Sequence, residues 1–348
     1  MERRLKVRFI TRKWAPAIGG METYCLRLTE HIKDRVDLDI HALYGNADGS
    51  APGLLKIAIF GLRIMFKLLY LPRVDTVHVS DMASWPLAFV AKLSRPKTHI
   101  VISAHGSDLS YETRSGVKPK IYKAYMRLGA ICLPRVTVLA NSQWIADLAV
   151  RKGFKDVQLI PLATDMVASK PPQNISRNLL YAGRIMTSKG VSFIINDVLP
   201  RLPEDILLRV AGTIWDEEES EALGHPRVVF LGQLTPRELS KEYADALCIV
   251  VPSLAPEGFG LVAIEGALTG GVVLASDHTG LSEVCKHGLG LPLAAGNGKV
   301  WADEILSVAS WSSEGRRKFI EHAQSEAKLR YSWQRVADET LDAYKPAI

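Results

Sequence analysis

Several features that would assign this protein to a class at once are missing from its sequence. Its four cysteines (Cys25, Cys132, Cys248 and Cys285) are widely scattered, and none forms a Cys-x-x-Cys pair. This spacing excludes a disulfide framework and a cysteine-rich zinc site, and it indicates free thiols in a reducing compartment. No run reaches the roughly 18 uncharged apolar residues of a membrane-spanning helix. Residues 1–6 lead into a strand without an apolar signal segment. We therefore expect a cytoplasmic protein.

Charge is the first positive signal. The net charge is +6, but residues 1–165 hold 25 Lys and Arg against 14 Asp and Glu, whereas the rest of the chain holds 18 against 23. A basic first half favours an anionic partner, namely a membrane surface, a nucleic acid or a phosphorylated substrate. Because the sequence has no zinc finger and no basic run interleaved with aromatics, we expect no nucleic-acid partner.

Strand and helix patterns alternate along both halves of the chain. We expect strands at 5–10, 76–79, 99–103, 136–140, 157–161, 179–182, 206–211, 228–231, 248–251 and 272–275, with helices between them. Such alternation predicts an α/β protein whose parallel sheets are covered by helices on both faces. The polar, proline-bearing stretch 166–174 is the best linker candidate. We therefore expect two doubly wound, Rossmann-like domains, 1–165 and 166–330, facing a cleft.

The segment from Pro256 to Gly266 carries the most chemistry. It follows the apolar run 248–252 and includes Glu257, Gly258, Phe259, Gly260, Leu261 and Glu265. Glycines at a helix start expose backbone N–H groups, which together with the helix dipole favour a phosphate. If residues 257–265 are helical, the two carboxylates lie about 12 Å apart on a similar face. They would then suit the two hydroxylated ends of a nucleotide-sugar, although a helix start with solvated acids explains the segment equally well.

The same segment also resembles a dinucleotide fingerprint. Gly258, Gly260 and Ala263 have the required spacing, and Asp277 follows the next apolar run. In that fingerprint, however, the first glycine lies in the tight turn directly after the strand. Here residues 253–257 intervene, so an NAD-dependent oxidoreductase is the less favoured alternative.

Three further loops follow expected strands. Arg184 and Lys189, five residues apart, come after the strand at 179–182, where they could neutralise a diphosphate. His105 follows the strand at 99–103 and could hydrogen-bond a substrate hydroxyl or stabilise developing charge. Gly19 and Gly20 lie between the first strand and its helix, where a ligand could approach the backbone. Each loop taken singly is also compatible with surface cations, a satisfied histidine or a plain turn.

The helix expected at 54–71 is unusually apolar. Its only charges are Lys56, Arg63 and Lys67, which fall within roughly 40° of one another at about 100° per residue. Such a helix either packs into a core with its cations reaching solvent or lies in a bilayer interface. With the basic first half, the second interpretation is favoured, and we expect peripheral association with the inner face of the membrane.

Taken together, these motifs resemble those of the family 4 glycosyltransferases of GT-B fold. The resemblance rests on Gly19-Gly20, the stretch 105–108, Gly183-Arg184 with Lys189-Gly190, and Glu257 followed by Glu265. It covers nearly the whole chain, including Ser332-Trp333. In that family a closing helix, here 331–348, crosses back to the first domain.

The resemblance implies a donor nucleotide diphospho-sugar as substrate, with no cofactor and no metal. Arg184 and Lys189 would bind the diphosphate, and the amides of Gly19 and Gly20 would approach it from the other side. Glu257 and the amides of Gly258, Phe259, Gly260 and Leu261 would hold the donor sugar. Glu265 would hold the ribose, residues 232–234 would lie near the base, and His105 would contact the sugar near the reacting carbon.

The function expected on these grounds is a retaining transfer of a sugar to a glycan or lipid-linked acceptor, in cell-envelope polysaccharide or glycolipid synthesis. A non-catalytic nucleotide-sugar-binding subunit on the same fold is a second alternative beside the oxidoreductase. The base, the donor sugar and the linkage are not readable from single residue identities.

Overall fold

The computed structural model describes residues 3–17, 19–111, 116–168 and 176–345. The chain divides into two units, the first made of residues 1–162 and 333–348, the second of residues 163–332. The sequence analysis had placed the domain boundary between residues 165 and 166, and it had expected the chain to return to the first domain at residue 331. Part of the expected linker, residues 169–174, lies outside the described residues.

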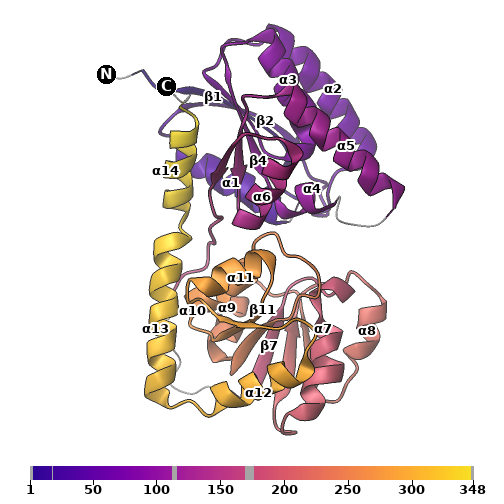
Figure 1. Ribbon diagram of the computed structural model, residues 1–348, viewed down its shortest axis with the longest axis vertical. Coiled ribbons are helices and arrows are strands. Elements are labelled where there is room, and N and C mark those ends of the chain that lie inside the picture. Colours follow the sequence, from indigo (N-terminus) through magenta and orange to yellow (C-terminus); the bar gives the residue numbers. More distant parts are fainter. Residues whose placement is uncertain (1–2, 18, 112–115, 169–175, 346–348) are drawn as a thin grey trace. The chain divides into compact units, whose positions relative to one another are not determined.

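The first unit is a parallel sheet between two helical layers. Its strands are β1 (Lys6–Trp14), β2 (Asp37–Tyr44), β3 (Thr76–Val79), β4 (His99–Ala104), β5 (Thr137–Ala140) and β6 (Asp156–Leu159), in the order β2-β1-β3-β4-β5-β6. Its helices are α1 (Gly20–Ile32), α2 (Leu54–Tyr70), α3 (Trp85–Ser94), α4 (Gly106–Ser110), α5 (Val117–Cys132), α6 (Gln143–Lys152) and α14 (Trp333–Ala343), with a 3₁₀ turn η1 (Met82–Ser84). Helices α2, α3 and α5 lie side by side on one face of the sheet (Figure 1).

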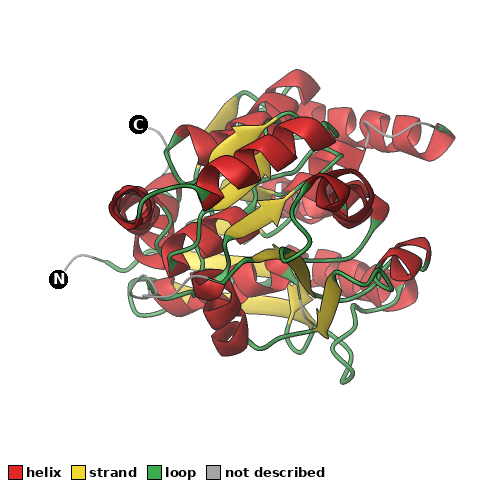
Figure 2. Ribbon diagram, turned by 90° about the horizontal axis from the view of Figure 1, so that it is seen from below, coloured by secondary structure: helices red, strands yellow, loops and turns green. Residues whose placement is uncertain are grey.

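The second unit has the same layered construction (Figure 2). Its strands are β7 (Asn178–Ala182), β8 (Leu207–Ala211), β9 (Val228–Gly232), β10 (Cys248–Val251), β11 (Val273–Ser276) and β12 (Leu291–Leu293), in the order β12-β11-β10-β7-β8-β9 and all parallel. Its helices are η3 (Thr187–Lys189), a continuous stretch α7–η4–η5 (Val191–Phe193, Ile194–Val198, Leu199–Arg201), α8 (Glu218–Ala222), α9 (Pro236–Asp245), α10 (Leu261–Thr269), α11 (Thr279–Lys286), α12 (Gly298–Ala309) and α13 (Ser313–Arg330).

The central strands form where consecutive residues are apolar, so that the side chains on both faces of the sheet can be buried. Every residue of β3, β5, β10 and β11 is buried, as expected for strands covered on both faces. The expected α/β fold with two doubly wound sheets is therefore confirmed. The sequence analysis missed the edge strands β2 and β12, and it ended the first strand at residue 10, whereas β1 continues to Trp14.

Helix α14 completes the core of the first unit. Its Trp333 ring contacts Tyr24 and His31 of α1, with centroids 6.5 and 6.2 Å apart. Beyond the helix, Tyr344 is fully buried and donates or accepts a 2.8 Å hydrogen bond with Nδ1 of His78 on β3. The last helix of the chain thus belongs to the unit that begins it, as expected.

Within the described residues, no helix is long and apolar enough to cross a membrane.

Candidate functional site

In the second unit, the candidate residues gather at the point where the strand order reverses. Strands β7 and β10 are neighbours in the sheet, yet the chain leaves them toward opposite edges. Loops at the carboxyl ends of two such strands diverge and leave a crevice, which is where ligands bind in open α/β sheets. Arg184 and Lys189 follow β7, and Glu257 follows β10. The sheet topology therefore brings two cations and a carboxylate to one place.

Lys189 and Glu257 form an ion pair across this point. Glu257 also accepts a 2.6 Å hydrogen bond from the hydroxyl of Ser253, and its backbone N–H donates to Thr279 Oγ1 at 2.9 Å. Burial alone would raise the pKa of Glu257, but Lys189, Ser253 and the nearby charge of Arg184 lower it below its ordinary value. Glu257 is consequently an anion at neutral pH, fixed in position by three neighbours.

The two loops are tied together by their backbones. The carbonyl of Ser188 accepts hydrogen bonds from the N–H groups of Leu254 and Ala255, at 2.9 and 3.2 Å. Gly190 has a positive φ of 75°, and a Cβ there would collide with the carbonyl of Pro252. Glycine is required at this position because the loops approach too closely for any side chain.

Arg184 is exposed beside this pair, unlike Lys189. Its guanidinium lies over the ring of Trp215, with 4.8 Å between the guanidinium carbon and the ring centroid. A stacked guanidinium keeps its N–H edge available, which suits bidentate contact with a phosphate.

The structure corrects the expected geometry of the two glutamates. Helix α10 begins only at Leu261, so Glu257 and Glu265 do not lie on one helix, and the 12 Å separation along a helix does not apply. Residues 257–260 form a loop that ends at Gly260, which has a φ of 102° and precedes the helix. The glycines after Glu257 thus allow the loop to turn into the helix rather than extend it.

Glu265 has a different environment on the first turns of α10. Its carboxylate accepts hydrogen bonds from Thr164 Oγ1 and the Tyr243 hydroxyl, both at 3.3 Å. Burial raises its pKa to about 7; the two hydroxyls oppose the shift, and the charge of Asp165 adds to it. Residues 232–234 begin at the last residue of β9, which lies at the far edge of the sheet, two strands from β7.

In the first unit, His105 follows β4 and is buried. Its Nε2 lies 3.1 Å from the carbonyl oxygen of Ser80, which can only accept, so Nε2 carries the proton and Nδ1 carries none. Burial is the main cause that lowers its pKa, to about 4. The ring is therefore neutral at pH 7.

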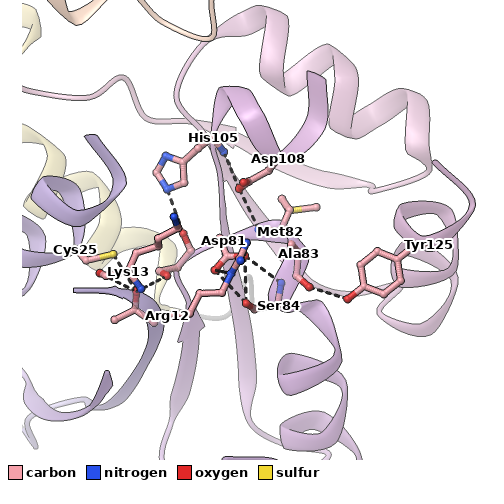
Figure 3. A network of polar contacts seen from close by, with 12 residues as sticks. Arg12, Lys13, Cys25, Asp81, Met82, Ala83, Ser84, His105, Asp108 and Tyr125 are labelled. Carbon is pink, nitrogen blue, oxygen red and sulfur yellow. Dashed lines mark hydrogen bonds and ion pairs between the residues drawn. The ribbon is translucent and has the colours of Figure 1, made fainter. Parts of the chain in front are cut away.

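The sequence analysis overlooked a polar cluster around His105, shown in Figure 3. Arg12 of β1 donates to both carboxylate oxygens of Asp81, at 3.1 Å, and Asp81 also accepts from the backbone and hydroxyl of Ser84. Asp108 accepts from the N–H of Met82 at 3.2 Å and from that of His105 at 3.4 Å. Burial, followed by the charge of Asp81, raises the pKa of Asp108 to about 7.

This cluster also lies at a reversal of strand order, between β1 and β3. Arg12 and Asp81 are 69 residues apart and share no motif. The only signal in the sequence was that each comes at or just after the end of an expected strand. Gly19 precedes α1 and Gly20 begins it, and the carboxylate of Glu22 lies 3.4 Å from Lys13.

Within the described residues, no three His, Cys, Asp or Glu side chains are grouped as metal ligands. The sequence analysis found no recognisable Asp-x-Asp metal site, although Asp37 and Asp39 have this spacing. This pair lies at the start of β2, away from the carboxyl ends of the strands, and Asp39 receives a 2.7 Å hydrogen bond from Arg8.

The comparisons with known proteins agree with this arrangement. The sequence model described as "Glycosyltransferase Family 4" matches residues 18–167, and that described as "Glycosyl transferases group 1" matches residues 176–310. The HepE protein of Anabaena, solved with UDP and glucose, superimposes with a TM-score of 0.77 at 17% identity, over 97% of this chain and 99% of that one. The fold is thus that of the GT-B glycosyltransferases. The family 4 model covers the first part of the chain, residues 18–167, and supports a relationship to that family of glycosyltransferases.

Curated relatives are more similar over shorter stretches. An uncharacterized glycosyltransferase of Methanocaldococcus jannaschii is 31% identical over 51% of this chain and 46% of its own length. Phosphatidyl-myo-inositol mannosyltransferase of Mycobacterium leprae is 31% identical over 58% of each chain. The chain matches about half the length of such relatives.

Proposed function

We propose that this protein is a retaining glycosyltransferase that moves a sugar from a nucleotide diphosphate donor to a glycan or lipid-linked acceptor. The observation that carries the proposal is the grouping of Arg184, Lys189 and Glu257 at the β7/β10 reversal of the second unit. Two cations beside a fixed carboxylate match the charge pattern of a diphosphate joined to a hydroxylated sugar.

Each donor group has a candidate partner in the second unit. Arg184 and Lys189 bind the diphosphate. Glu257 accepts hydrogen bonds from the hydroxyls of the donor sugar, supported by the amides of Gly258, Phe259, Gly260 and Leu261. Glu265 accepts hydrogen bonds from the two ribose hydroxyls. These donors would favour the ionised carboxylate and lower the pKa of Glu265 from about 7. Residues 232–234 contact the base.

The first unit contributes His105, Gly19 and Gly20. His105, neutral and with its proton on Nε2, contacts the donor sugar near the carbon where the new bond forms. It is too weak a base to be the main proton acceptor at neutral pH. The Gly19 and Gly20 amides approach the diphosphate.

In the proposed reaction, the bond between the anomeric carbon and the diphosphate oxygen breaks while the acceptor hydroxyl attaches to the same face of the sugar. Negative charge grows on the departing diphosphate, and Arg184 and Lys189 stabilise it without a metal ion. The acceptor loses its proton, which the departing diphosphate can accept. Acceptors in cell-envelope polysaccharide or glycolipid synthesis fit this role.

The test begins with binding. UDP and other nucleoside diphosphates should raise the melting temperature, because a ligand that binds only the native state stabilises it. Arg184→Ala should abolish this shift. Arg177→Ala is the matched control. Arg177 is an exposed arginine that directly precedes the first residue of β7, at the end of the strand away from Arg184, and it pairs with Asp205.

Turnover separates the alternatives. Glu257→Gln should lower kcat for transfer from a nucleotide diphospho-sugar by at least about 100-fold, since it weakens contacts to the reacting sugar. Stabilisation by NAD rather than by a nucleoside diphosphate would support the oxidoreductase alternative. Binding of a nucleotide-sugar with no turnover on any acceptor would support the non-catalytic subunit.

A further inference from the structure

Helices α2 and α5 of the first unit both expose an apolar stripe. On α2 it consists of Leu55, Ile59, Leu62, Phe66 and Leu69, and on α5 of Val117, Ile121, Leu128 and Ile131. These side chains are between 49% and 75% exposed. Their spacing of alternately four and three residues, interrupted on α5 only by Ala124, keeps each set on one side of its helix.

Both stripes face away from the sheet in the same layer. The opposite side of α2 buries Ile64 and Leu68, and the opposite side of α5 buries Met126 and Ala130, in one hydrophobic core. Helix α3 lies between α2 and α5 (Figure 1) and exposes Leu93 by 69%. The three helices therefore present a shared outer surface, which we name the α2/α5 face.

The charges beside these stripes have a single sign. Lys56, Arg63 and Lys67 flank the stripe on α2, and Lys118, Lys120, Lys123 and Arg127 flank the stripe on α5. Neither helix contains Asp or Glu. Large apolar side chains between cations are what an amphipathic helix presents when it lies in the headgroup region of an anionic bilayer.

We propose that the α2/α5 face docks on an anionic phospholipid bilayer, with both helices lying in the plane of the interface. The apolar stripes enter the boundary of the acyl chains while the flanking cations contact the headgroups. A second copy of the chain fits less well, because two such faces would bring cations against cations with no acid on either helix. This inference does not depend on the glycosyl transfer proposed above.

The experiment is flotation of the full-length protein with two kinds of vesicle. One contains phosphatidylcholine alone, and the other contains phosphatidylcholine with an equal amount of phosphatidylglycerol. We expect binding to the anionic vesicles at low salt and a large loss at high salt, because screening weakens exposed charge interactions. Changing Lys118, Lys120 and Lys123 to Gln should lower the partition coefficient about 100-fold, at roughly fivefold per cation.

Apolar variants test the stripes themselves. Leu62→Glu with Phe66→Glu should abolish binding, and Ile121→Glu with Ile131→Glu should do the same through α5. Leu329→Glu is the control, because Leu329 is 68% exposed on α13 in the other unit. The melting temperature without ligand, measured on every variant, verifies folding and keeps this test separate from that of the proposed function.

Three results would overturn the proposal. The wild type could leave anionic vesicles unbound at low salt. The α5 variants could bind vesicles like the wild type, which would show that α5 is not part of the membrane-binding surface. The protein could also form a dimer that Leu62→Glu with Phe66→Glu dissociates, which would show that a second copy covers the α2/α5 face.

Discussion

The guanidinium carbon of Arg184 lies 4.8 Å from the centroid of the Trp215 ring, and both side chains are exposed. A cation over an indole at an exposed site gains about 0.5–1 kcal/mol. The stack restricts where Arg184 points, so that its orientation does not depend on the ligand.

Replacing this indole should therefore weaken donor binding without changing the chemistry. Trp215→Ala is expected to raise KM for the donor about two- to fivefold, the equivalent of the lost stacking energy, with kcat nearly unchanged. Trp215→Phe, which keeps an aromatic face, is the control and should retain most of the affinity. Steady-state kinetics at varied donor concentration measures KM and kcat for both variants. An unchanged KM in Trp215→Ala would show that the stack does not orient Arg184.

Removing the partner of Glu257 should destabilise the protein in a pH-dependent way. In Lys189→Met the carboxylate keeps Ser253 but loses its cation, at an expected cost of about 1–3 kcal/mol at pH 7. The folded pKa of Glu257 is lowered, so the stabilisation from this pairing is present above the unfolded pKa and is lost as pH falls through the folded value.

Urea unfolding at pH 7 and pH 4 measures the difference, which should be larger at pH 7. Lys286→Met, at an exposed lysine of α11, is the control. A Lys189→Met protein as stable as the wild type at pH 7 would mean that the pair has no net effect on folding.

Glu265 should make nucleotide binding depend on pH. Its pKa is about 7, raised mainly by burial, so it is mostly protonated at pH 6 and mostly ionised at pH 8. Because ribose hydroxyls donate to the ionised form, affinity for UDP should rise with pH, by about tenfold per unit below pH 7.

Titration calorimetry of the wild type and Glu265→Gln over this range isolates the effect. The phosphate of UDP also titrates, but it does so equally in both proteins. Identical pH profiles would argue against contact between Glu265 and the ligand.

The buried pair of His78 and Tyr344 should hold the end of the chain in place. His78 accepts or donates at Nδ1 to the Tyr344 hydroxyl and contacts Ser103 through Nε2 at 2.7 Å. Tyr344→Phe leaves Nδ1 without this partner, which should cost about 1–3 kcal/mol of unfolding free energy. Tyr70→Phe, at a 71% exposed tyrosine, should change stability little by the same measurement. Equal stability of the two variants would contradict this assignment.

The sequence was sufficient to predict the fold class because most strands are continuous apolar runs, such as Cys248–Val251, bounded by turns. Strand β2 was not predicted, because Asp37 and Asp39 interrupt its apolar pattern and because the strand is only half buried at the edge of the sheet. Strand β12 was not predicted, because it has only three residues and one of them is Pro292.

The site was predictable to the extent that its residues follow strands. Arg184, Lys189 and Glu257 come together because β7 and β10 are adjacent, which the order of patterns along the chain does not reveal. The helical interpretation of residues 257–265 was wrong because Gly258 and Gly260 permit a loop before α10. The pairing of Arg12 with Asp81 depends on the register between β1 and β3, for which no local signal exists. The ligands assigned to all these residues stay predictions until binding is measured.

The return of α14 to the first unit sets an order for folding during synthesis. Residues 163–332 form a continuous segment, so the second unit can fold as soon as it leaves the ribosome. The first unit, although begun earlier, still lacks Trp333 and Tyr344 at that moment, and its sheet face beside Tyr24 and His78 stays uncovered. The first unit, translated before the second, is therefore completed after it.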